Sequence, residues 1–101
     1  MPKFGVRVPH TLTKDEARSR LERFVDVIEQ KYADKVSDLK QSWEGDVLRF
    51  HFKSYGISID GDITVADDAL NLVGDLPFAA MMFKGKIESE IRDSLEKIVA
   101  A

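Results

Sequence analysis

The sequence contains no cysteine, only three prolines and six glycines, and no long hydrophobic run among its 101 residues. Without cysteine the chain has no disulfide framework, no thiol nucleophile and no zinc site built on sulfur, which fits an intracellular protein. Its longest uncharged stretch is far shorter than the roughly 20 residues that a membrane-spanning helix requires. The first residues also lack the apolar core of a signal peptide. We therefore expect a cytoplasmic protein without a transmembrane segment.

The sequence also has no large excess of charge of either sign. It contains 15 Lys and Arg residues and 18 Asp and Glu residues, which give a net charge of -3. A nucleic-acid-binding protein of this charge would need its positive residues gathered on one face, and the sequence shows no such cluster. We expect no nucleic acid among its partners. With 44% hydrophobic and 33% charged residues, the composition is that of an ordinary globular protein, and the length predicts a single domain over residues 1–101.

Two elements are predicted at the start of the chain. Apolar residues alternate with others over residues 4–8, which is the period of a short strand with one buried face. Thr13 then stands three residues before Glu16, the spacing of a capping box at the start of a helix. This helix should end near Asp34. Its apolar face consists of Ala17, Leu21, Phe24, Val25, Ile28 and Tyr32.

From Val36 onward the apolar period changes from helical to alternating and predicts four successive strands. Turns are expected at residues 44–46, 54–56 and 66–69. The first of the four strands has an imperfect register. The third is expected to bend at Gly61, where the side chain is missing.

A C-terminal helix completes the predicted fold. Glu88 and Arg92, and likewise Asp93 and Lys97, are spaced as stabilising opposite-charge pairs on its surface. The order of strand, helix, four strands and helix indicates an α+β fold, with a curved antiparallel sheet of about five strands and both helices on one face.

The uncharged run of residues 76–83, closed by Lys84-Gly85-Lys86, does not fit this helix. A helix continuous from Pro77 would place Phe78 opposite the apolar stripe that includes Ile87, with Met81 and Met82 well to one side. Either the helix breaks near Gly85, or these large side chains face away from the core. Exposed apolar patches mark interaction sites, and methionine adapts to irregular apolar partners. The candidate binding surface therefore consists of Phe78, Met81, Met82 and Phe83, with Lys84 and Lys86 at its rim.

Other interpretations of the apolar residues stay open. The methionines could fill gaps in the core, or a self-complementary patch could close a homodimer. Trp43, Phe50 and Phe52 could line a pocket between the sheet and the C-terminal helix, suited to a small acyl or lipid-like ligand. The same aromatic residues could simply fill the core of a small domain.

No pattern in the sequence indicates catalysis, a metal or a cofactor. His10 and His51 have no neighbours that make them bases, and the nucleophile elbow Gly-x-Ser-x-Gly is absent. Asp60 and Asp62, with the later pair at 67–68, lack the spacing and the distal Glu of a calcium loop. We expect a protein that is not an enzyme and holds neither metal nor cofactor.

Three segments resemble one known family. They are Trp43-Glu44-Gly45-Asp46 followed by Leu48 and Phe50, then Phe83-Lys84-Gly85-Lys86-Ile87-Glu88, and the opening His10-Thr11-Leu12-Thr13. Together they are similar to the polyhydroxyalkanoic acid system family. The resemblance implies a small bacterial protein encoded among genes for making and using storage polyester, and it supplies no catalytic residues. It implies an accessory protein that binds the granule surface or a granule protein; an acyl-ligand carrier is the alternative.

Overall fold

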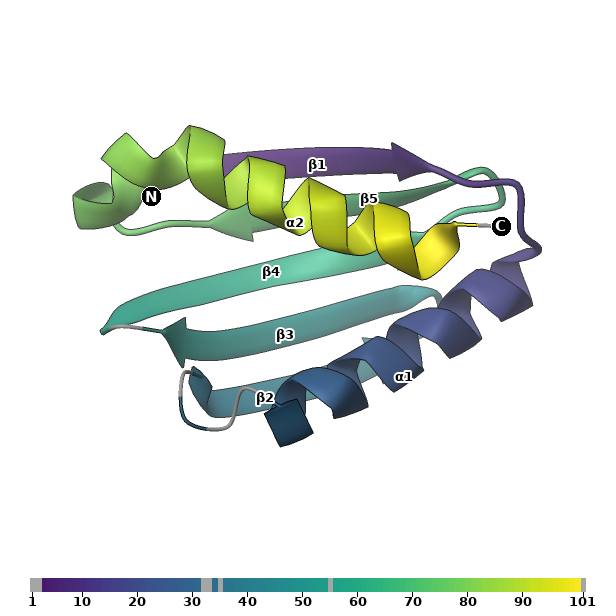
Figure 1. Ribbon diagram of the computed structural model, residues 1–101, viewed down its shortest axis with the longest axis horizontal. Helices are drawn as coiled ribbons and strands as arrows, with labels where there is room; N and C mark the ends of the chain where they lie inside the picture. Colours follow the sequence, from purple (N-terminus) through teal and green to yellow (C-terminus); the bar gives the residue numbers. More distant parts are fainter. Residues whose placement is uncertain (1–2, 32–33, 35, 55, 101) are drawn as a thin grey trace.

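The computed structural model describes residues 3–31, 34, 36–54 and 56–100. Five strands and two α-helices follow one another in the predicted order, with a short 3₁₀ helix, η1, before the last α-helix (Figure 1). The elements are β1 (Lys3–Pro9), α1 (Lys14–Lys31), β2 (Val36–Glu44), β3 (Val47–Ser54), β4 (Ile57–Val65), β5 (Ala69–Asp75), η1 (Phe78–Phe83) and α2 (Lys84–Val99).

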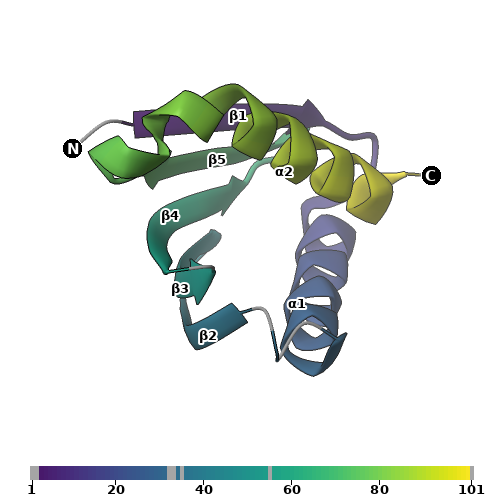
Figure 2. The ribbon, with the colours of Figure 1, turned by 60° about the vertical axis from the view of Figure 1, so that its left-hand side comes forward.

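The five strands form one antiparallel sheet in the order β1-β5-β4-β3-β2. Strands β1 and β2 are consecutive in the chain but occupy opposite edges, so α1 carries the chain from one edge to the other. Both helices lie on the same face of the curved sheet (Figure 2). The predicted α+β fold is confirmed. The molecule measures 37 × 25 × 23 Å, and η1 lies at one end of its longest axis (Figure 1).

The core fills the space between the sheet and the two helices. Alternate residues of the strands point into it, and burial of each large side chain stabilises the fold by about 1.5–3 kcal/mol. Its least exposed large side chains are Leu21, Leu48, Leu70, Leu76, Val8 and Val65. The predicted apolar face of α1 contributes Ala17 and Leu21, whereas Tyr32 and the side chain of Ile28 lie outside the described part of the chain.

Only one of the two hydrogen bonds of the predicted capping box forms at the start of α1. The backbone N–H of Glu16 donates to Thr13 Oγ1 at 3.1 Å. The Glu16 carboxylate does not complete the capping box, because it accepts a hydrogen bond from Arg20 Nε at 3.0 Å. The described part of the helix runs to Lys31, and the residues between it and the predicted end near Asp34 lie outside the described part of the chain.

Arg20 also joins the two helices. Its Nη1 donates to the carbonyl oxygens of Ile98 at 3.2 Å and Ala100 at 2.7 Å. The last carbonyls of an α-helix have no partner within the helix and carry partial negative charge. A cation from α1 therefore caps the C-terminus of α2.

Two glycines allow aromatic rings to lie directly on the sheet. Gly61 on β4 is paired with Phe50 on one side and with Gly74 on the other. A methyl group at Gly61 would stand 2.7 Å from Phe50 Cζ, and one at Gly74 would meet the ring of Phe4. The strand register continues unbroken through Gly61, and its missing side chain leaves room for the Phe50 ring. The imperfect register predicted for β2 is confirmed as a shift between Ser37 and Lys40.

The free edge of β1 is covered by side chains of α2. The backbone N–H of Gly5 donates to Glu88 Oε2 at 3.1 Å, and the carbonyl of Arg7 accepts from Arg92 Nη1 at 3.2 Å. The ion pair predicted between Glu88 and Arg92 is wrong, because each side chain binds the strand instead. Covering an edge in this way prevents other chains from pairing with it.

Candidate functional site

The uncharged run begins in the core and then leaves it. Leu76 is fully buried, and Pro77 keeps the chain extended before the first turn of η1. The Ala80 N–H donates to the Pro77 carbonyl at 2.9 Å. Only Ala80 is buried within η1. The continuous helix considered from the sequence is thus replaced by a 3₁₀ segment with three residues per turn, and α2 begins at Lys84, one residue before Gly85.

Four large apolar side chains are exposed on η1. The exposed fraction is 81% for Phe78, 83% for Met82, 49% for Phe83 and 38% for Met81. The described residues include only two other exposed large apolar side chains, Val27 on α1 and Val73 on β5. Exposed apolar area is therefore concentrated on one short element. We call these four η1 residues the apolar patch.

The charged residues beside the apolar patch leave it with a positive rim. Lys86 is exposed and Lys84 is half-buried, and no ion pair of the described residues involves either. The first carboxylate before the patch and the first one after it in the sequence each have another partner. Asp75 lies 3.8 Å from Lys3 Nζ, and Glu88 accepts from the backbone of β1.

The three aromatic residues considered as pocket lining are half-buried against the core. Phe50 and Phe52 stack with their ring centroids 6.0 Å apart, and the Phe50 ring also contacts Gly61. Arg18 lies over the Trp43 ring, with Cζ 4.3 Å from the centroid. Trp43 is thus covered by α1, not by the C-terminal helix. Each ring thus packs against other parts of the protein, and Phe50 also lines a hollow on the sheet.

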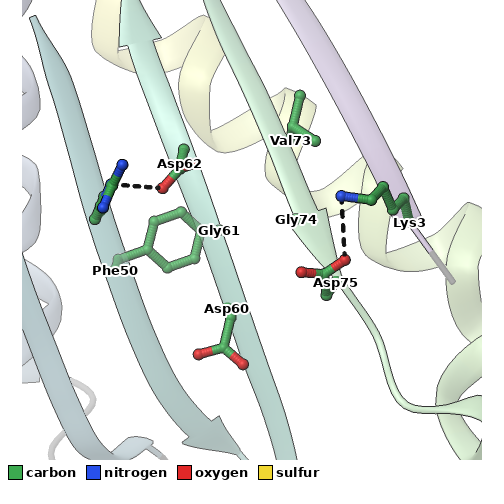
Figure 3. Close-up of a pocket in the computed structure, with 9 residues that line it drawn as sticks. Lys3, Phe50, Asp60, Gly61, Asp62, Val73, Gly74 and Asp75 are labelled. Carbon is green, nitrogen blue, oxygen red and sulfur yellow. Dashed lines mark ion pairs between the residues drawn. The ribbon is translucent and has the colours of Figure 1, made fainter. Parts of the chain in front are cut away.

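The opposite face of the sheet carries a shallow polar hollow of about 290 Å³. Figure 3 shows Lys3 beside Asp75 at this hollow. Asp62 Oδ1 lies 3.7 Å from Arg49 Nε on the neighbouring strand. Next to it, His51 Nδ1 lies 2.5 Å from Asp60 Oδ1. Each of the two carboxylates on β4 therefore has a side-chain partner on β3.

Asp67 and Asp68, the other two aspartates considered from the sequence, lie beside cationic side chains. Asp67 lies 3.8 Å from Lys14 Nζ and Asp68 lies 3.6 Å from Arg7 Nη2. Asp46 also binds Lys14, at 3.0 Å, and together these carboxylates hold the pKa of Lys14 above its ordinary value of 10.5. Within the described ranges no three metal-binding side chains come together.

His10 has a structural position. Its buried ring accepts a hydrogen bond from the Leu12 N–H at Nδ1, 3.1 Å away, and lies 3.0 Å from the Ala66 carbonyl through Nε2. The two contacts together require a neutral ring with its proton on Nε2. Both ring nitrogens are therefore occupied in holding the β1–α1 connection against the turn between β4 and β5.

Comparison with known families finds a match over nearly the whole chain. The model of a family described as polyhydroxyalkanoic acid system proteins matches residues 5–99. The chain belongs to this family. The match runs from β1 to the end of α2 and includes the whole apolar patch. This match confirms the resemblance to the polyhydroxyalkanoic acid system family that three segments of the sequence indicated.

No curated protein matches this family member. Over the residues that the structure describes, none of its helices has the length and apolar character needed to cross a membrane.

Proposed function

We propose that this polyhydroxyalkanoic acid system protein is a non-enzymatic accessory protein that docks on the apolar surface of polyester granules through η1. The observation that carries the proposal is the exposure of four large apolar side chains on one short element. Contiguous exposed apolar groups tend to mark interaction sites. The family supplies the polyester context.

The position of η1 favours an extended surface as the partner. The element lies at one end of the longest axis (Figure 1), so it can reach a flat or convex apolar surface without a matching groove. Met82 and Met81 have flexible thioether side chains that adapt to an irregular partner. Lys84 and Lys86 can keep their ammonium groups in water at the rim while their alkyl stems are buried.

The charged groups outside the apolar patch support a non-enzymatic role. His10 uses both ring nitrogens to hold two loops together, and His51 is bound to Asp60 on an open sheet face. A general base needs a substrate position within hydrogen-bond reach and a partner group placed to assist it. His10 has no free ring nitrogen for this role, and the pair of His51 and Asp60 stands on an open sheet face that excludes no water.

The test is co-sedimentation with particles made from purified, protein-free polyester. The variant Phe78→Ser/Met82→Ser removes the two most exposed side chains of the patch. Full burial of each would stabilise the docked state by about 1.5–3 kcal/mol, so the variant should bind about 100-fold more weakly or worse. Its melting temperature should equal that of the wild type, because substitutions of exposed residues change stability by roughly 0.5 kcal/mol or less.

The matched control is Val27→Ser/Val73→Ser, which removes two exposed apolar side chains from other surfaces. This control should sediment with the particles like the wild type. If the wild type binds native granules and not protein-free polyester, its partner is a granule protein and the proposed surface docking is wrong. Equal binding by the η1 variant and the control would show that the apolar patch is not the contact.

A further inference from the structure

The methionines of this chain are concentrated where the proposed contact occurs. The sequence has three methionines, and Met81 and Met82 are adjacent in the apolar patch. Met82 is 83% exposed. Because the chain has no cysteine, it contains no thiol that would compete for a two-electron oxidant. The Met82 thioether is therefore the most accessible of its easily oxidised groups within the described part of the chain.

Oxidation would change the chemistry of the most exposed side chain of the patch. A hydroperoxide transfers one oxygen atom to the thioether: a sulfur lone pair forms the S–O bond, the O–O bond breaks, and the peroxide leaves as an alcohol or water. Sulfur is oxidised and the peroxide is reduced, so no further reactant is needed. Two thiols can reverse the change through a sulfoxide reductase, forming a disulfide and water.

We propose that Met82, together with Met81, is an oxidation site that releases the protein from its apolar surface. This inference rests on the docking proposed above. A sulfoxide is polar, so burying it against polyester would leave an oxygen acceptor without a hydrogen-bond partner. The fold is expected to survive the oxidation of Met82, because this side chain has little contact with the core. Docking and oxidation should therefore exclude one another.

The experiment treats the wild type with dilute hydrogen peroxide until peptide mass spectrometry finds one added oxygen at Met82. Circular dichroism checks that the oxidised protein stays folded. Binding to protein-free polyester particles should then fall by about tenfold or more, the loss expected when one buried Met side chain no longer contributes. The variant Met81→Leu/Met82→Leu keeps an apolar patch of similar size without a thioether, and its binding should be unaffected by peroxide.

A second readout on the same particles measures protection. Met82 in surface-bound protein should gain oxygen more slowly than Met82 in free protein, because the docked thioether is shielded from the oxidant in solution. If oxidised wild type still sediments, the inference is overturned while the docking stands. Peroxide-induced release of the Leu variant would also overturn it, since the release would originate elsewhere. If unoxidised wild type fails to bind, the docking itself is wrong and this inference falls with it.

Discussion

Substitution of Gly61 by alanine should destabilise the protein through a contact visible only in the folded sheet. The added methyl group would stand 2.7 Å from Phe50 Cζ and 3.0 Å from the Val73 carbonyl oxygen. The Phe50 ring would have to shift against Phe52, on which it stacks, and the Val73 oxygen belongs to the backbone of the neighbouring strand. Overpacking of this kind costs about 1–3 kcal/mol, which exceeds the gain of about 0.4–1 kcal/mol from a less flexible unfolded chain.

Thermal unfolding followed by circular dichroism measures the effect. For a domain of this size, 1 kcal/mol shifts the melting temperature by about 4–8 °C, so Gly61→Ala should melt roughly 5–15 °C below the wild type. Gly85→Ala is the matched control, because a methyl group there meets nothing within 4 Å and Gly85 lies in α2. The control should be as stable as the wild type or more stable, by up to about 1 kcal/mol.

The result also bears on the alternative function. If Gly61→Ala melts at or above the wild-type temperature, the Phe50 ring does not pack on β4 and is free to line a space. That outcome would refute the packing described for the core and favour the acyl-ligand carrier. If the packing is right, the double variant Gly61→Ala/Phe50→Leu should lose less stability than the sum of the losses of the two single variants. The two losses are not additive because both substitutions affect the same contact.

Two further outcomes are expected from charged groups. Arg20→Ala should lower the free energy of unfolding by about 1 kcal/mol, because the C-terminal carbonyls of α2 lose their cationic cap. The control Arg23→Ala, on the same helix, should have little effect. Urea unfolding measures both variants, and equal midpoints would contradict the prediction. The pKa of Lys14 is raised in the folded protein because Lys14 binds Asp46 and lies near Asp67. Its positive charge therefore stabilises the folded state fully below pH 10.5, the ordinary lysine value. This contribution is lost as the pH rises through the higher pKa of the folded state. The difference in melting temperature between wild type and Lys14→Gln should therefore be constant near neutral pH and shrink above pH 10.5; a difference that stays unchanged there would contradict the assignment.

Local patterns in the sequence were sufficient to predict the order of elements. Alternation and helical period are written in neighbouring residues, and the turns between strands are marked by Gly45 and Gly56, which adopt positive φ values of 59° and 77°. The irregularity of β2 was also visible, and it centres on Asp38 with a φ of 53°. Such features depend on a few consecutive residues, so the chain alone reveals them.

Features that depend on partners distant in sequence were not predictable. Glu88 and Arg92 have the spacing of a helical ion pair, but the edge of β1 offers backbone groups that need partners, and nothing near residue 88 indicates that edge. The cover of Trp43 by Arg18 follows from the path of α1 between the sheet edges. For the candidate site, the sequence identified the residues of the apolar patch, while the 3₁₀ geometry that exposes them depends on the anchoring of Leu76 and Ala80 in the core.

If the protein docks on granules as proposed, the place of η1 at the end of the longest axis determines how it covers them. A molecule of 37 × 25 × 23 Å that touches a surface through one tip stands upright, and its footprint is the smaller cross-section. Many copies can then crowd side by side where fewer would fit lying flat. The end that bears the β1–α1 connection and the turn between β4 and β5 would point outward (Figure 1). The layer that other molecules in the surroundings meet would thus be made of those loops, with the apolar residues hidden beneath it.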